Sequence, residues 1–168
     1  MYQVGDKIVY PMHGAGVIEA IEEKEILGNI NSYYILRVPT GNISLMVPVK
    51  NAAEIGVRDV VAPEVIDRLF THILDTNVDM HENWNKRYRE NMTKIKSGDL
   101  FEIGPIYYYL MQKELEKGLS TGEKKMFGSA HQILVSEIIL SKNISQKEAE
   151  ELIASRLGTG ETPQAISV

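Results

Sequence analysis

"PEVIDRLFTHIL", residues 63–74, is where the chain changes from the periodicity of strands to that of helices. Apolar residues recur there every three or four positions, which predicts a helix with one buried face. They are Val65, Ile66, Leu69, Phe70 and Ile73. Pro63 suits the first turn, where no backbone N–H is needed. The stretch therefore predicts a boundary between a β region before it and a helical region after it.

The residues before this boundary have the short period and frequent turns of strands. "DKIVYP" is followed by the turn residues of "MHGAG", and "VIEAIEEKEI" then alternates apolar and polar residues. "SYYILRV" and "ISLMVPV" are rich in β-formers and are set off by the turns "LGNIN" and "PTGN". Four or five short strands in under 60 residues predict a small, strongly bent antiparallel barrel. Such a module is usually a binding surface.

The residues after the boundary predict about five helices, so the fold class is α+β with two domains. The second helix covers 83–96 with Asn83 as its N-cap, and Asp99 caps the third. Gly104 and Pro105 predict a kink or a delayed start in that third helix. The last two begin with capping boxes, Ser120 to Glu123 and Ser145 to Glu148. We expect a β domain at 1–60, a helical domain at 61–157 and a disordered tail at 158–168.

Composition indicates the cellular compartment and excludes some kinds of site. The 168 residues are 43% hydrophobic, and no run approaches the roughly 18 apolar residues that span a bilayer. The chain has no cysteine, which excludes disulfides and thiolate metal sites and fits a reducing compartment. We therefore expect a cytoplasmic protein that does not enter a membrane.

Few residues are arranged for catalysis. None of His13, His72, His81 and His131 has another histidine or a carboxylate at the spacing of metal ligands. "HGAG" and "GTG" both lack the pattern of a phosphate-binding loop. We therefore expect no enzymatic activity, no metal and no cofactor.

Basic charge is concentrated in one segment of an acidic chain. The net charge is −5, yet "NWNKRYRENMTKIK", residues 83–96, holds five basic residues against Glu90 alone. As a helix, this segment places Trp84, Tyr88, Met92 and Ile95 on one face and turns Lys86, Arg89 and Lys96 away, with Arg87 and Lys94 on the flank. The apolar stripe favours a core position for Trp84. Its place at the helix start, beside cations, fits a side chain that stacks on nucleic-acid bases. The pattern leaves both interpretations open.

Five collinear segments resemble the CarD/CdnL family of bacterial transcription regulators. They are "VGDKIVYPMHGAGVIEAIEEKEILG", "VPVKNAAEIGVRDV", "NWNKRYREN", "KIKSGD" and "EKGLSTGEKKM...AHQILVSEI". The resemblance implies an N-terminal Tudor-like, SH3-like barrel that binds the β subunit of RNA polymerase. It also implies a helical domain that contacts promoter DNA at the upstream edge of the transcription bubble and stabilises the open complex. We expect this DNA contact to be largely independent of sequence, and the bound protein to be a nucleoid-associated monomer.

The resemblance also assigns residues. It implies that Trp84 wedges into the minor groove, and that a set of cations contacts DNA: Lys86, Arg87, Arg89, Lys124 and Lys125. On the polymerase side it implies a role for Lys24 and for the strand that holds Leu45, Met46 and Val47. Met46 is a departure, because several relatives have arginine there, and Gly104-Pro105 is another. The alternative is a Tudor-like adaptor whose helical domain binds protein and not DNA.

Overall fold

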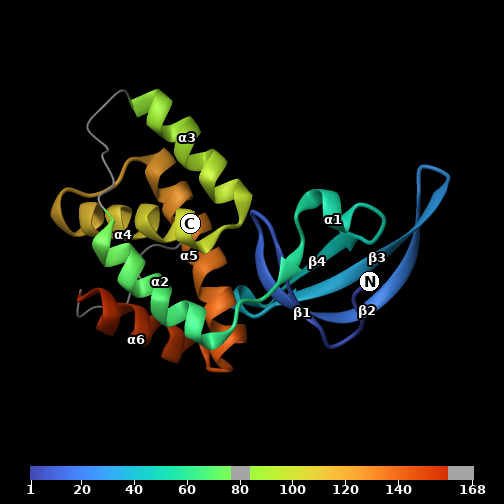
Figure 1. Cartoon of the computed structure of the whole chain (residues 1–168). Helices are drawn as coiled ribbons and strands as arrows, with labels where there is room; N and C mark the ends of the chain where they lie inside the picture. Colours follow the sequence, from blue (N-terminus) through green and yellow to red (C-terminus); the bar gives the residue numbers. More distant parts are fainter. Residues whose placement is uncertain (77–83, 159–168) are drawn as a thin grey trace.

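The computed structural model describes residues 1–76 and 84–158, with side chains in the second range from residue 86 onward. An antiparallel sheet comes first and a group of helices follows, which confirms the α+β class. The two halves lie side by side, and the β2–β3 hairpin extends away from the helices (Figure 1). Residues 159–168 of the predicted tail and the predicted N-cap at Asn83 lie outside the described residues, whereas Gly158 is described as the C-cap of the last helix.

Five antiparallel strands form the sheet. They are β1 Lys7–Tyr10, β2 Gly14–Ile26, β3 Asn29–Val38, β4 Ile43–Pro48 and β5 Arg58–Asp59. Their order is β4-β3-β2-β1-β5, so β4 and β5 form the edges. Two short elements connect them, a 3-10 turn at Thr40–Asn42 and α1 at Ala52–Ile55. Leu27 and Gly28 join β2 to β3 with φ angles of 53° and 81°, the left-handed geometry of a two-residue hairpin turn.

Within residues 1–76 and 84–158, five helices follow the sheet, in agreement with the predicted number. They are α2 Pro63–Asp75, α3 Trp84–Ser97, α4 Leu100–Glu116, α5 Thr121–Lys142 and α6 Gln146–Leu157. The predicted caps form: Asp99 accepts a hydrogen bond from the Phe101 N–H, and Ser120 and Ser145 both make complete capping boxes. Local sequence therefore determines where these helices begin.

The expectation of a delayed start at Gly104-Pro105 is wrong, because α4 begins at Leu100 and runs through both residues. Pro105 has no N–H to offer the Phe101 carbonyl four residues earlier. His72 Nε2 lies 3.1 Å from that oxygen and can donate to it instead. At Gly104, an added Cβ would lie 2.7 Å from Ile73 Cδ1, so glycine permits the close approach of α2 to α4. Tertiary contacts thus compensate for two poor helix formers.

The sheet contributes to two hydrophobic cores. Ile8 belongs to the core of the sheet, together with Tyr34, Leu36 and Val47. Its neighbour Val9 belongs to the large core of the helices. Successive side chains of a strand point to opposite faces, so β1 is covered on one side by the sheet and on the other by helices. This double burial fixes the sheet against the helical half.

Candidate functional site

The helix α3 is the structural counterpart of the basic segment. Ile95 is fully buried, and Tyr88 and Met92 pack partly buried against the helical core. These three residues confirm the predicted apolar stripe. Asn91 is also buried, with 5% of its surface exposed, which the stripe did not predict. The side chain of Trp84 lies outside the described part of the molecule, so its predicted contact with DNA remains a prediction.

The cations of α3 lie mostly in solvent. Lys86 and Arg89 are exposed, as the helical projection predicted. Lys86 Nζ is 4.0 Å from a Glu90 carboxylate oxygen, and Lys94 Nζ is 3.8 Å from one of Glu102. Exposed pairs at these distances contribute little to stability. An external anion can therefore compete with these carboxylates for the two lysines.

Arg87 differs from the other cations of this helix. Its side chain is half-buried, and its Nε and Nη1 atoms are buried without a hydrogen-bond partner among the described residues. An unsatisfied donor of this kind costs free energy in the isolated protein. Because these two atoms are buried, a phosphate or carboxylate oxygen would reach them only if the guanidinium moved outward, where it would bind the anion in a planar fork.

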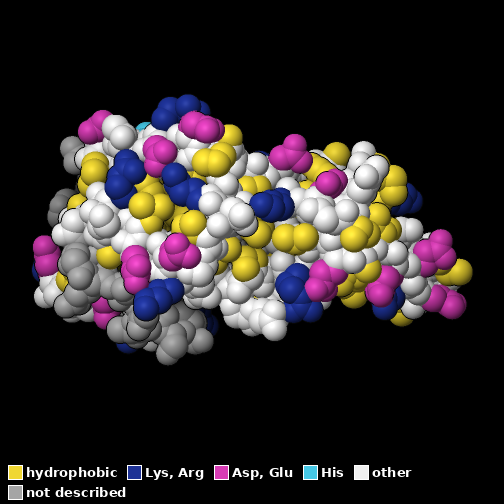
Figure 2. All heavy atoms as spheres, turned by 90° about the horizontal axis from the view of Figure 1, so that it is seen from below, with side chains coloured by type: hydrophobic (Ala, Val, Ile, Leu, Met, Phe, Trp, Pro, Cys, Tyr) yellow, Lys and Arg dark blue, Asp and Glu magenta, His cyan; other side chains and the backbone are white. Residues whose placement is uncertain are grey.

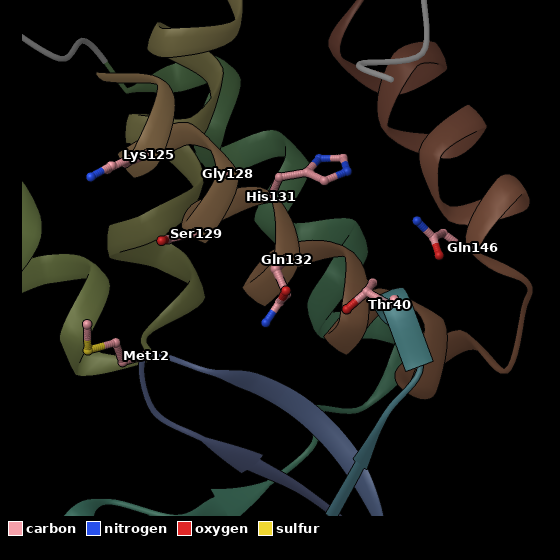
Figure 3. Close-up of a pocket in the computed structure, with 9 residues that line it drawn as sticks. Met12, Thr40, Lys125, Gly128, Ser129, His131, Gln132 and Gln146 are labelled. Atoms are coloured by element: carbon pink, nitrogen blue, oxygen red, sulfur yellow. The ribbon is translucent and has the colours of Figure 1, made fainter. Parts of the chain in front are cut away.

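The second predicted basic pair, Lys124 and Lys125, lies exposed in the early turns of α5. Lys125 borders a groove of about 510 Å³ between the sheet and the helices. The groove is lined by Met12, Thr40, Gly41, Lys125, Gly128, Ser129, His131, Gln132 and Gln146. Lys125 points away from His131 and Gln146 (Figure 3). Because α3 contacts α5, both basic sets lie on helices that pack together.

The residues predicted to face the polymerase fall on two sides of the sheet. Lys24 is opposite Asn31, and Met46 is opposite Ile35. Since Asn31 and Ile35 lie four residues apart on β3, both pairs project from the same face. This outer face also includes Tyr33, and both Lys24 and Met46 are exposed on it. The structure therefore brings these two predicted residues onto one accessible surface.

Leu45 and Val47 project from the other face of β4. They are opposite Leu36 and Tyr34, and Val47 has no exposed surface. In this conformation the two side chains pack the interior of the sheet and support the strand that carries Met46.

The surface charge of the two halves differs. Acidic side chains gather with hydrophobic ones at the narrow end formed by the sheet, whereas lysines and arginines alternate with acidic residues over the helical half (Figure 2). Lys24 pairs with Glu22 at 3.3 Å, within the acidic strand β2. Phosphate is therefore repelled from the hairpin end and is better accepted by the helices.

Two of the described histidines have hydrogen-bond partners, and these lie in separate places. His72 faces a carbonyl, whereas His131 lies 3.2 Å from both the Tyr107 hydroxyl and the Glu150 carboxylate. Burial lowers the pKa of His131 below its ordinary value, although Glu150 opposes the shift. Within residues 1–76 and 84–158, no three histidines or carboxylates converge as metal ligands, and no helix has the length and apolar composition needed to cross a bilayer. His81 lies outside the described residues.

Sequence reasoning missed the ion pairs of buried carboxylates, among them the one between the sheet and α5. Arg58 in β5 binds Glu137 in α5, and the Glu137 side chain is only 1% exposed. One signal was available, because Glu137 interrupts the apolar run "ILVSEIIL", residues 133–140. A charge inside such a run needs a buried partner.

Comparison with known proteins agrees with this architecture. Residues 2–61 match the family model "CarD-like/TRCF RID domain", and residues 68–154 match "CarD, C-terminal domain". The chain is 40% identical over 151 residues to the Bacillus subtilis (strain 168) protein named "Putative transcription factor YdeB", covering 88% of this chain and 97% of that protein. A solution structure of the 72-residue N-terminal domain of Myxococcus xanthus CarD is 34% identical, with a TM-score of 0.31, covering 35% of this chain and 79% of that one. The chain belongs to the CarD family of transcription factors.

Proposed function

We propose that this protein binds the β subunit of RNA polymerase through its sheet and stabilises the promoter open complex through its helical domain. The proposal divides the chain near residue 60, in accord with the two adjacent family matches. It places promoter DNA at the upstream edge of the bubble, against α3 and the first turns of α5. The protein would act as a monomer at the nucleoid.

The observation that supports the DNA contact is that α3 is buried along one edge and carries exposed cations on the rest of its surface. One edge of the helix is held in the core by Ile95, while its exposed side carries several cations. They are Lys86, Arg89, Lys94 and Lys96. Contacts of this kind bind phosphates without reading bases. A net charge of −5 is acceptable if the polymerase supplies most of the affinity, because tethering raises the local concentration of the helices at the promoter.

The polymerase contact is assigned to the outer face of the sheet. Lys24 and Met46 are accessible there, and Leu45 and Val47 support the strand from behind. The family match of residues 2–61 to an RNA polymerase-interacting domain supports this assignment. We expect Lys24→Glu to weaken binding to the isolated β-subunit lobe. Lys147→Glu, an equal charge change at an exposed site on α6, is the control. Equal binding by both variants would place the interface elsewhere.

Site-specific crosslinking tests the DNA contact. A photoreactive residue at Arg89 should crosslink promoter DNA in the polymerase complex, and the yield should fall as salt rises because phosphate contacts release counterions. The same group at Glu151, exposed on α6, is the control. Crosslinks from position 89 to protein alone would favour the adaptor, whose helices bind protein.

A further inference from the structure

Arg58 connects three parts of the molecule. It belongs to the edge strand β5, where it is opposite Val9 of β1. Its Nη1 donates to Glu137 Oε2 at 2.7 Å and its Nη2 donates to Glu137 Oε1 at 2.8 Å, a bidentate pair. Oε2 also accepts the Val61 N–H at 3.0 Å. The buried carboxylate thus joins α5 to the sheet and to the segment that leaves it.

The same guanidinium also reaches the end of α3. Arg58 Nη2 donates to the Gly98 carbonyl at 2.8 Å, immediately after the last residue of that helix. A cation is favourable at a helix C-terminus, where the carbonyl groups are unpaired. An added Cβ at Gly98 would lie 3.3 Å from Pro11, so the end of α3 lies close against the turn between β1 and β2. One side chain therefore links the proposed polymerase-binding half to the proposed DNA-binding helix.

Other hydrogen bonds hold α5 itself on the sheet. Ser136 Oγ accepts the Ala15 N–H at 2.9 Å, and Gln132 Nε2 donates to the His13 carbonyl at 2.8 Å. An added Cβ at Gly14 would lie 2.8 Å from Ser136 Oγ, so the contact requires glycine. Glu137 therefore belongs to a helix that is held on the sheet by several contacts, and Arg58 connects the end of α3 to that helix.

We propose that Arg58 is a positioning residue, which sets the direction of α3 relative to the sheet and uses Glu137 as its anchor. This inference rests on the proposed function, because direction matters only if the sheet and α3 hold different partners. The helix spans 14 residues, or about 21 Å at 1.5 Å per residue, so a tilt of about 5° at Gly98 moves its Trp84 end by about 2 Å. Lysine cannot replace Arg58 here, because a single ammonium lacks the planar fork that meets both carboxylate oxygens and a carbonyl.

A distance measurement tests the geometry. The chain has no cysteine, so Ala53→Cys in α1 and Lys86→Cys near the start of α3 provide two unique spin-label sites. We expect Arg58→Lys and Glu137→Gln to shift or broaden the distance distribution by about 1–2 Å. Arg68→Lys, an exposed arginine on α2, should leave it unchanged. If the distance distributions of Arg58→Lys and Glu137→Gln both match that of Arg68→Lys, Arg58 does not position α3. If a thermal melt shows that Arg58→Lys does not fold, the distance distribution of the isosteric variant Glu137→Gln tests the proposal instead.

Open-complex lifetime tests the consequence. In the full polymerase complex, Arg58→Lys should shorten the lifetime toward that of Trp84→Ala, while its affinity for the β-subunit lobe stays unchanged. If Trp84→Ala shortens the lifetime and Arg58→Lys does not, the positioning inference fails and the proposed function stands. If Trp84→Ala itself has no effect, the proposed function fails, and the spin-label distances still decide whether Arg58 orients α3.

Discussion

Helices α3 and α5 use charged residues in opposite ways. Along α5 the charge at Glu137 is buried, bidentate with Arg58 and hydrogen-bonded to backbone. Along α3 two lysines form loose pairs at the surface, and two buried donors of Arg87 have no hydrogen-bond partner within the described part of the chain. The difference separates a helix whose buried charge holds the protein together from one whose charges lie mostly in solvent, in exposed pairs. It predicts that substitutions on α5 act mainly on stability and that substitutions of α3 cations act mainly on binding.

The largest effect is expected on α5. Glu137→Leu removes one partner of a buried ion pair and should lower the free energy of unfolding by about 3–5 kcal/mol. Glu151→Leu, exposed on α6, should change it by less than about 0.5 kcal/mol. Urea denaturation measures both. A cost below about 1 kcal/mol for Glu137→Leu would mean that α5 does not depend on this charge.

The apolar edge of α3 gives the next largest effect. Ile95 is fully buried, so Ile95→Ala should cost about 2–5 kcal/mol through lost burial and a cavity. Thr93→Ala, on the exposed side of the same helix, is the matched control. If both cost equally little in urea denaturation, α3 is not anchored as described.

The free energy of unfolding should fall at acid pH because of His131 on α5. His131 has a lowered pKa in the fold because burial disfavours the charged form. The unfolded chain therefore takes up a proton as pH falls through the ordinary value of 6.5, while the folded protein does not, so stability declines below that pH. Replacing His131 with Gln should reduce this dependence when unfolding is compared at about pH 7.5 and pH 5.5. An unchanged slope would assign the acid sensitivity to other groups.

The smallest effect on stability, and a clear effect on binding, is expected at Arg87. Arg87→Ala removes buried donors that have no partner among the described residues, so it should not lower the free energy of unfolding by more than about 0.5 kcal/mol. In the polymerase–promoter complex it should reduce the salt dependence of DNA binding by about one phosphate contact. Glu90→Ala, one turn away on the exposed side, should not reduce that dependence. If Arg87→Ala greatly lowers the free energy of unfolding and leaves the salt dependence of DNA binding unchanged, Arg87 supports the fold and does not bind phosphate.

Sequence patterns predicted the elements of this fold because their signals are local. Asp99, Ser120 and Ser145 mark helix starts by hydrogen bonds that span two or three residues. The apolar stripe of α3 likewise predicted the burial of Ile95.

The contacts between elements could not be predicted in the same way. Arg58 and Glu137 are 79 residues apart, and nothing near Arg58 indicates its partner. Pro105 was expected to disturb α4. The sequence does not show the compensating contact of His72 with the Phe101 carbonyl, because that contact depends on how another helix packs against α4. The division of β4 into an accessible Met46 and a buried Val47 follows only from strand register.

Open-complex lifetime on a defined promoter tests the central claim most directly. Base stacking by one aromatic residue is worth about 1–3 kcal/mol, so Trp84→Ala should shorten the lifetime by roughly one to two decades. Binding to the β-subunit lobe should be unaffected. An unchanged lifetime with normal polymerase binding would contradict the assignment of α3 to promoter DNA.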